Sequence, residues 1–212
     1  MTPEHLGPAP VLVARADAPL GTALVLHGQY ADAATHAKEL ALLAGAGWNA
    51  VGVDAPEHGR RFHDGRDAKW QADPEGCLEA HLEEASAEIP AVLDACESRG
   101  LHGPFAVIGV SLGAFTTWRA MARDSRLQIA VPILGSPALP GQDAPDPGPW
   151  RGRRVLAQNA EHDEVVPLGP TRALLAQIGG TLHILEGSPH LVPEVQWWGA
   201  WGRTLAWLNG NR

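Results

Sequence analysis

The sequence predicts an α/β protein with a mostly parallel central sheet of about six to eight strands and helices on both faces. Short apolar runs alternate with longer amphipathic stretches along the chain, as in a parallel sheet connected by helices. The runs are continuously apolar, which is typical of strands covered on both faces. A length of 212 residues suits one domain with a sizeable core, so we expect a single domain over 1–212 without a full cap.

Each predicted strand is a short run rich in Val, Ile, Leu and Ala that ends at a turn signal. The expected strands are 11–14, 22–26, 49–53, 105–110, 129–134, 154–158 and 181–185. Functional residues in open parallel sheets gather just beyond the carboxyl ends of the strands. The segments that follow these runs are therefore the ones that we expect to carry chemistry.

Helices are expected where the pattern changes to amphipathic stretches: 33–46, 77–98, 112–123, 170–178 and 193–208. Pro90 predicts a kink or a break in the second of these helices, because proline removes a helical hydrogen bond. Residues 57–76 are polar and rich in turn formers, and 137–151 are dense in Pro, Gly and Asp. Both are expected to be loops at the rim of the functional site.

The composition argues against several functional classes. The formal net charge is −8, whereas a nucleic-acid binder usually carries a basic face. The chain has no apolar run long enough to span a membrane and no basic-then-apolar start typical of a secretory signal, so we expect a cytoplasmic protein. The two cysteines, Cys77 and Cys96, form neither a disulfide framework nor a zinc motif.

The strongest functional signal is Gly109-Val110-Ser111-Leu112-Gly113, which lies where a predicted strand meets a predicted helix. This context is the one that a nucleophile elbow requires. The sharp turn raises the serine hydroxyl above the sheet, and the crowded backbones require small residues two positions to either side. The alternative is a purely structural turn, but the motif in this setting predicts Ser111 as a nucleophile.

A serine nucleophile needs a base, and the base needs an orienting acid. In this architecture the acid and then the histidine follow the serine along the chain. Asp163 follows the predicted strand 154–158, with Glu161 and Glu164 as competing acids, and we favour Asp163. His190 follows the last predicted strand and is the expected base; His183 lies inside that strand and His162 lies in the loop of the acid.

An acyl transfer also needs donors for the oxyanion. One expected donor is the backbone N–H of Leu112, directly after the nucleophile. The second is the N–H of Gln29, in the loop that starts His27-Gly28 after the strand 22–26. The alternative for His27-Gly28 is an ordinary turn at the end of a strand.

Four further residues are candidates for substrate binding. His58 and Arg60 follow a strand and are able to hold an acidic group, although a structural role is favoured for both. Trp70 and Trp150 lie in the two expected rim loops. Trp70 is expected either to wall an acyl pocket or to anchor its loop, and Trp150 is expected to line the site from the side of 137–151. His58, His63 and Asp64 do not amount to a metal site, so no metal is predicted.

These residues together resemble the α/β-hydrolase superfamily, and within it the cap-less esterases related to dienelactone hydrolase and to the catalytic domain of prolyl oligopeptidase. The resemblance rests on 26–28, 54–60, the elbow, 134–137, 163–167 and His190, and it spans most of the chain. It implies Ser111, Asp163 and His190 as a catalytic triad, with Gln29 and Leu112 as oxyanion donors. Dienelactone hydrolase has a cysteine where this chain has Ser111, and the family's first one or two strands are expected to be missing.

The expected activity is hydrolysis of a carboxylic ester, or of a thioester, through an acyl-enzyme, without a cofactor. The expected partner is a small-molecule ester, with no nucleic acid, and the chain is expected to be a monomer or a homodimer. Two alternatives stay open: a non-catalytic binding protein on the same fold, and a peptidase, perhydrolase or C–C hydrolase. An excess of tryptophan near the carboxyl end, in 193–208, fits the core or a dimer surface.

Overall fold

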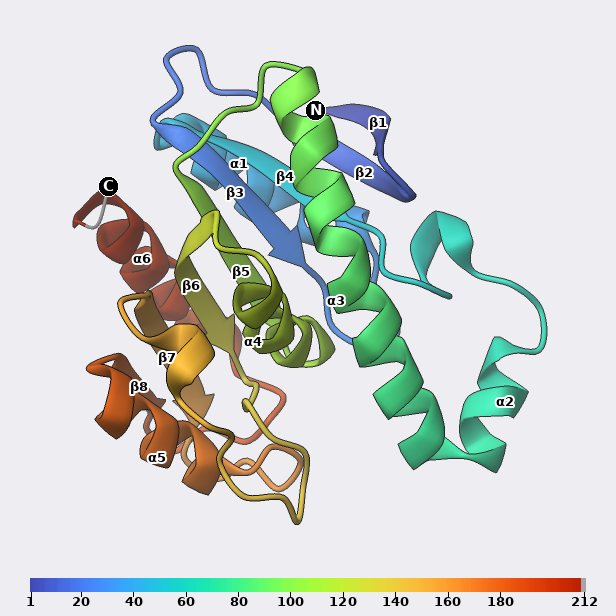
Figure 1. Ribbon diagram of the computed structural model, residues 1–212, viewed down its shortest axis with the longest axis vertical. Helices are drawn as coiled ribbons and strands as arrows, with labels where there is room; N and C mark the ends of the chain where they lie inside the picture. Colours follow the sequence, from blue (N-terminus) through green and yellow to red (C-terminus); the bar gives the residue numbers. More distant parts are fainter. Residues whose placement is uncertain (211–212) are drawn as a thin grey trace.

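An eight-stranded sheet forms the centre of the molecule, and helices cover both of its faces (Figure 1). The computed structural model describes residues 1–210. The strands are β1 (Thr2–Leu6), β2 (Ala9–Ala14), β3 (Gly21–Leu26), β4 (Trp48–Val53), β5 (Phe105–Val110), β6 (Leu127–Ile133), β7 (Arg154–Ala160) and β8 (Thr181–Leu185). Their order across the sheet is β1-β2-β4-β3-β5-β6-β7-β8. None of the helices within 1–210 is both long enough and apolar enough to cross a membrane.

The six strands from β4 to β8 in this order run parallel, and β1 and β2 are antiparallel to their neighbours. The register aligns the carboxyl ends of the central strands: Leu26 at the end of β3 lies opposite Val53 on β4 and Gly109 on β5. Loops from distant parts of the chain therefore meet at one edge of the sheet. This edge is where functional residues of parallel sheets gather.

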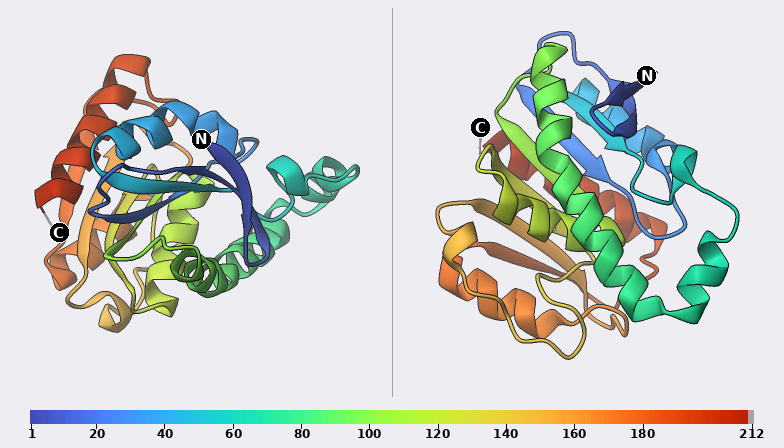
Figure 2. Two further views of the ribbon diagram at one scale, coloured as in Figure 1. Left: turned by 90° about the horizontal axis from the view of Figure 1, so that it is seen from above. Right: turned by 45° about the vertical axis from the view of Figure 1, so that its right-hand side comes forward.

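Apart from α2, which projects beside the sheet next to α3, the α-helices form two layers, one on each face of the sheet (Figure 2). The α-helices are α1 (Ala37–Gly45), α2 (Arg66–Ala72), α3 (Pro74–Ser98), α4 (Leu112–Arg123), α5 (Leu168–Ile178) and α6 (Glu194–Gly210). Short 3-10 turns, η1 (Ala33–His36), η2 (Gly59–Arg61) and η3 (Gly148–Trp150), lie in the connections. The apolar faces of α1 and α6 pack on one side of the sheet and those of α3, α4 and α5 on the other.

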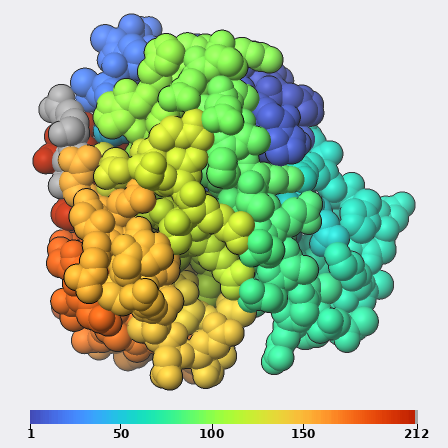
Figure 3. Space-filling view, in the orientation of Figure 1, coloured from blue at the N-terminus to red at the C-terminus, as the bar shows by residue number. Residues whose placement is uncertain are grey.

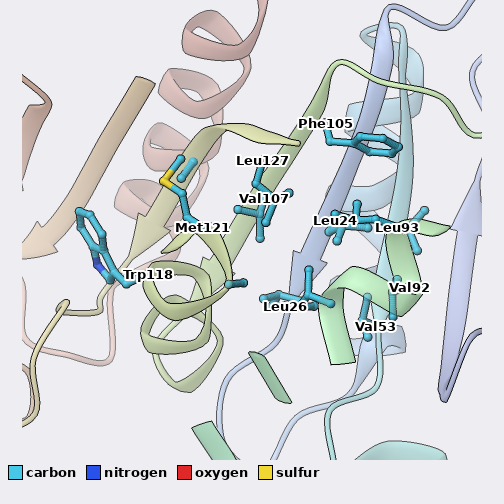
Figure 4. Packing of buried hydrophobic residues seen from close by; sticks show 14 of the residues in the cluster. Leu24, Leu26, Val53, Val92, Leu93, Phe105, Val107, Trp118, Met121 and Leu127 are labelled. Atoms are coloured by element: carbon cyan, nitrogen blue, oxygen red, sulfur yellow. The ribbon is translucent and has the colours of Figure 1, made fainter. Parts of the chain in front are cut away.

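The core between the sheet and the helices α3 and α4 is dense in aliphatic side chains (Figure 4). Leu24 and Val107 on the central strands are fully buried in one cluster with Val92 and Leu93 of α3. Burial of each such side chain contributes ~1.5–3 kcal/mol. The strand β5 is buried at all six positions, and it carries the turn with Ser111 at its end, so this turn begins from a fully buried strand.

The predicted mostly parallel α/β architecture is confirmed, but the amino-terminal expectation was wrong. A hairpin is present there: β1 pairs with β2, and β2 pairs with β4. The first strand was not predicted because Thr2–Leu6 lies at the edge of the sheet, where only Leu6 is buried. An edge strand of this kind shows no apolar pattern.

One expectation about 57–98 was also wrong, and a second is narrowed. Residues 57–76 are not one continuous loop, since they contain η2, α2 and the start of α3. Of the two outcomes expected at Pro90, a kink or a break, the break does not occur, because α3 runs unbroken from Pro74 to Ser98. Ile89, Val92 and Leu93 pack on the sheet on either side of the proline, and this packing outweighs the one helical hydrogen bond that proline removes.

Candidate active site

Ser111 lies at the sharp turn between β5 and α4, and its backbone adopts the left-handed region with φ 50° and ψ −112°. Such a conformation is costly for a residue with a side chain and persists only where the surroundings enforce it. Here the N–H of Ser111 donates to the carbonyl of Ile133 at 2.9 Å, and the carbonyl of Ser111 accepts from Ala114 and Phe115 in the first turn of α4. The strained turn is thus held from both sides.

The glycines on either side of Ser111 are required by close backbone contacts. A Cβ at Gly109 would lie 2.1 Å from the carbonyl oxygen of Gly113. A Cβ at Gly113 would lie 2.2 Å from the carbonyl oxygen of Leu26, at the end of β3. Both distances are far below ordinary contact, so only glycine fits at each position.

A continuous hydrogen-bonded chain links the three predicted residues. The hydroxyl oxygen Oγ of Ser111 lies 2.9 Å from Nε2 of His190, and Nδ1 of His190 lies 2.8 Å from Oδ2 of Asp163. A carboxylate only accepts, so Nδ1 carries the proton and Nε2 is the free base that faces the hydroxyl. The three residues are separated by 27 and 79 positions in sequence, and the fold brings them together at the carboxyl edge of the sheet.

The loop after β7 fixes the carboxylate of Asp163. Its second oxygen, Oδ1, accepts from the N–H groups of Val165 and Val166 at 2.9 Å each, and its side chain is 3% exposed. Of the competing acids, Glu161 is exposed and accepts from the N–H of Gly187, and Glu164 is exposed. Asp163 is the acid that the structure places on His190.

The loop after β3 lies directly against the elbow. A Cβ at Gly28 would be 3.6 Å from Cβ of Ser111, and Gln29, the next residue, borders the same pocket as Ser111. Leu112 is the first residue of α4, so its N–H has no acceptor within the helix. Gln29, in the loop after β3, and Leu112, at the start of α4, thus come from two different elements that adjoin Ser111.

His27 anchors this loop from below. Its Nδ1 lies 2.8 Å from the carbonyl of Gly28, and its Nε2 accepts from the N–H of Ala55 at 3.1 Å. The carbonyl only accepts, so the ring is neutral with the proton on Nδ1. Burial lowers the pKa of His27 to about 4, because the charged imidazolium is poorly solvated there.

A pocket of about 470 Å³ opens above Ser111. Its lining comes from the loops after β3, β5, β6, β7 and β8 and from α6. The lining residues are Gly28, Gln29, Tyr30, Val110, Ser111, Leu134, Val165, His190, Leu191, Val192 and Trp197. The pocket is large enough for a small organic substrate.

The four further candidates lie elsewhere. His58 is buried, donates from Nδ1 to the carbonyl of Pro56 and accepts at Nε2 from Arg66, and it lines a neighbouring pocket. Burial lowers its pKa. Arg60 pairs with the buried Asp54 at 2.8 Å and borders another pocket. These contacts suit structural roles for both residues.

The two tryptophans are anchors in the structure and do not line the pocket above Ser111. Trp70 is buried and its indole N–H donates to Glu57 at 3.0 Å. Trp150 is buried in the core, where its indole N–H donates to the carbonyl of Trp118 at 3.0 Å. Each tryptophan pins its segment to the body of the fold.

Sequence reasoning missed Tyr30 and Arg66. Tyr30 borders both the pocket above Ser111 and the neighbouring pocket. The guanidinium of Arg66, on α2, is 2% exposed and lies 4.7 Å from the ring centre of Tyr30 and 5.0 Å from that of Trp70. These are cation–π contacts, and they tie α2 to the loop of Gln29. The position of Tyr30 directly after Gln29 was a sequence signal that Tyr30 lies at the site. No sequence signal indicated that Arg66, in a polar segment, would be buried.

A third buried histidine lies behind this cluster. His81, on α3, is 3% exposed, and neither ring nitrogen has a hydrogen-bond partner within 1–210. Its ring lies 5.1 Å from that of His58 and 5.7 Å from that of Trp70. Burial, with the neighbouring histidines His58 and His27, lowers the pKa of His81 to about 3. Within 1–210, no three His, Cys, Asp or Glu side chains form a group able to hold a metal.

The two expected rim segments face each other across a hollow of about 430 Å³. Figure 3 shows this notch between the start of α3 and the loop after β6. Pro74, Leu78, Leu139 and Pro140 are among the residues that line it. Within 1–210, this notch and the pocket above Ser111 share no lining residue.

Comparisons with known proteins identify the architecture. No family model matches the chain, and no curated protein matches it by sequence. Among solved structures, a protein from Thermus thermophilus has a TM-score of 0.75 and 22% identity over 99% of this chain and 96% of that one. A dienelactone hydrolase-like promiscuous phosphotriesterase from metagenomic libraries has a TM-score of 0.70 and 17% identity over 95% and 92%.

A cold-adapted esterase from an Arctic intertidal metagenomic library is similar as well, with a TM-score of 0.67 and 19% identity over 95% of this chain and 93% of that one. All three likenesses extend over nearly the whole of both chains. At these identities they establish the arrangement of the elements. Together with the sheet order and the elbow, they show that this chain has the α/β-hydrolase fold.

Proposed function

We propose that the protein is a serine hydrolase that cleaves a carboxylic ester through an acyl-enzyme. The observation that carries the proposal is the hydrogen-bonded chain from Asp163 through His190 to Ser111. The esterase and phosphotriesterase among the similar structures support hydrolysis as the use of this fold. The activity itself rests on the chemistry of the site.

Acylation begins when Oγ of Ser111 attacks the ester carbonyl carbon. The hydroxyl proton passes to Nε2 of His190, 2.9 Å away, and the carbonyl oxygen becomes an oxyanion. The intermediate then collapses: the bond to the leaving oxygen breaks, and His190 gives its proton to that oxygen, so an alcohol departs. The carboxylate of Asp163 holds the imidazole in the required tautomer and stabilises the imidazolium.

Deacylation repeats these steps with water as the nucleophile. His190 takes a proton from the water, whose oxygen attacks the acyl carbon. The ester bond to Ser111 breaks, and the proton returns from His190 to Oγ. The carboxylic acid is released and the enzyme is restored, so the cycle converts one ester and one water into an alcohol and a carboxylic acid and needs no other reactant.

The backbone N–H groups of Gln29 and Leu112 are the proposed oxyanion donors. Gln29 belongs to the loop after β3 and Leu112 to the first turn of α4, and both elements adjoin Ser111. Backbone dipoles in fixed elements need no reorganisation when the charge develops. Removal of one such donor typically costs ~3–4 kcal/mol of transition-state stabilisation. Two observations support this proposal: the strained backbone of Ser111 directly precedes Leu112, and the buried His27 is hydrogen-bonded to Gly28, directly before Gln29.

The test is Ser111→Ala, measured with p-nitrophenyl acetate and with a fluorophosphonate probe that labels active serines. We expect kcat/KM to fall at least about 10³-fold and labelling to disappear. Ser98→Ala, at the exposed end of α3, is the matched control and should keep both. Unchanged turnover or labelling in folded Ser111→Ala would refute the proposal.

A further inference from the structure

Three exposed apolar side chains surround the opening of the pocket above Ser111. Tyr30 is 76% exposed, Val165 is 60% exposed and Leu191 is 86% exposed, and all three line that pocket. We call these three residues the apolar rim. They come from the loops after β3, β7 and β8, so three separate segments place an apolar group at the same opening. Clustering of exposed apolar groups at a pocket typically marks a binding surface.

The interior of the pocket continues this character. Val110, Leu134, Val192 and Trp197 line it. The indole N–H of Trp197 donates to Glu39 at 2.8 Å, so the ring has only apolar surface left for the pocket. Among the described residues that line the pocket there is no Asp, Glu, Lys or Arg.

The adjoining pocket is charged, and its cation is already engaged. Arg66 donates from Nη1 to Asp67 at 2.7 Å and from Nη2 to His58 at 2.8 Å, and its guanidinium lies against the ring of Tyr30. Asp32 and Asp67 also line that pocket. The formal net charge of the chain is −8. Among residues 1–210, the lining of the two pockets holds no Lys or Arg other than Arg66, which is already paired with Asp67. A carboxylate on the substrate would therefore meet a repulsive field at the opening.

From these observations we propose a substrate class that rests on the proposed function: uncharged esters with an apolar chain or ring that extends from the pocket across the apolar rim. Contact with the rim removes apolar surface of both partners from water. The same contact discriminates against esters with a free carboxylate, because desolvation of that group would have no compensating partner. The rim thus determines specificity without taking part in bond making.

The first test is a chain-length series. Two sets of esters are compared below their aggregation concentrations: p-nitrophenyl acetate to octanoate, and alkyl acetates from methyl to octyl. We expect kcat/KM to rise about two- to fourfold per methylene in at least one set, the upper value corresponding to full burial of a methylene. A flat profile in both sets would overturn the proposal.

The matched variants are Leu191→Ser and Val195→Ser. Val195, at the start of α6, is 85% exposed and does not line the pocket, so the two substitutions remove similar apolar surface at similar exposure. Leu191→Ser should flatten the chain-length profile at the long end, so that the ratio of kcat/KM for the octanoate ester to kcat/KM for the acetate ester falls relative to wild type. Val195→Ser should leave the whole profile unchanged; equal effects of both variants would contradict the assignment of the rim.

A comparison of a charged with an uncharged ester tests the proposed discrimination against substrates with a free carboxylate. Wild type should prefer p-nitrophenyl pentanoate over the p-nitrophenyl monoester of succinic acid, which is similar in length and carries a carboxylate. Leu191→Arg supplies a cation at the opening and should raise the relative kcat/KM of the charged ester about two- to fivefold, the size expected of an exposed ion pair. Val195→Arg should change this ratio less. A wild-type preference for the charged ester would overturn the proposal.

The outcomes distinguish a failure of the proposed substrate class from a failure of the proposed hydrolase activity. If the fluorophosphonate labels Ser111 and the acetate ester is cleaved, but the profile is flat, the substrate class is wrong while the hydrolase stands. If neither labelling nor turnover occurs, both fall. If Leu191→Ser instead changes the elution volume on size exclusion and leaves the profile intact, the rim is a contact between copies of this chain and the substrate class is overturned.

Discussion

Gly113→Ala isolates the contact between the elbow and the oxyanion loop. The new Cβ would lie 2.2 Å from the carbonyl oxygen of Leu26 and 2.7 Å from that of His27. Real Cβ atoms essentially never approach closer than 3.0 Å, so the first turn of α4 and the end of β3 must separate by at least 0.8 Å (3.0 − 2.2). Both contacts are with backbone, which has no flexible end to move aside.

The separation acts on the reacting geometry, because Ser111 and Leu112 lie on one side of this contact and Gln29 on the other. Misplacement of catalytic groups by ~1 Å costs about 10²-fold in rate. We therefore expect kcat/KM for p-nitrophenyl acetate to fall about 100-fold. Overpacking should lower the free energy of unfolding by ~1–3 kcal/mol, reduced by the better helix propensity of alanine, so the variant should still fold.

The assay pairs initial rates with urea denaturation, and Gly202→Ala is the control. Gly202 is an exposed position in α6 at which an added Cβ meets nothing within 4 Å. The same substitution there should stabilise the protein by ~0.5–1 kcal/mol and leave kcat/KM unchanged. A folded Gly113→Ala protein that stays within about threefold of wild type would refute the steric reasoning.

Two predictions concern the acid and the buried histidines. Asp163→Asn should lower kcat about 10⁴-fold, because an amide favours the wrong tautomer of His190; steady-state kinetics check this, and the exposed neighbour variant Glu164→Gln should be silent. Burial lowers the pKa of His27 to about 4 and of His81 to about 3, below the ordinary value of 6.5. Below pH 6.5 the unfolded chain therefore binds more protons than the folded chain. The free energy of unfolding keeps its full value above pH 6.5 and falls as the pH drops toward 4 and 3, by ~3–5 kcal/mol for each histidine. Urea midpoints between pH 4 and 7 should fall less steeply with acid in His81→Leu than in wild type; parallel curves would show that His81 does not contribute.

The elbow and its partners were predictable because their signals are local or follow from topology. Gly109, Ser111 and Gly113 lie in one pentapeptide between a strand and a helix. Asp163 and His190 each follow a strand, and parallel strands bring such positions to one edge whatever the separation along the chain. Chain order and strand ends were therefore sufficient to predict which residues meet.

The surroundings of the site were not predictable in the same way, because they depend on contacts between distant segments. Trp150 looked like a rim residue in a Pro-rich loop, but its indole reaches the carbonyl of Trp118 in the core. Arg66 is a buried charge that two aromatic rings and His58 accommodate, and no periodic pattern reports such burial. The strand β1 was not predictable either, because it forms through pairing with β2 and its sequence has no apolar pattern.

The two oxygens of the Asp163 carboxylate have separate partners: Oδ1 is bound to the acid's own loop and Oδ2 to His190. In the proposed reaction the imidazole alternates between neutral and charged forms twice per turnover. The two hydrogen bonds from the loop to Oδ1 do not depend on the charge of the imidazole, so they restrain the acid through each of these changes. The activation barrier of the proposed reaction then includes little reorganisation of the acid. Within the hydrogen-bonded chain, movement is confined to the imidazole and the serine hydroxyl.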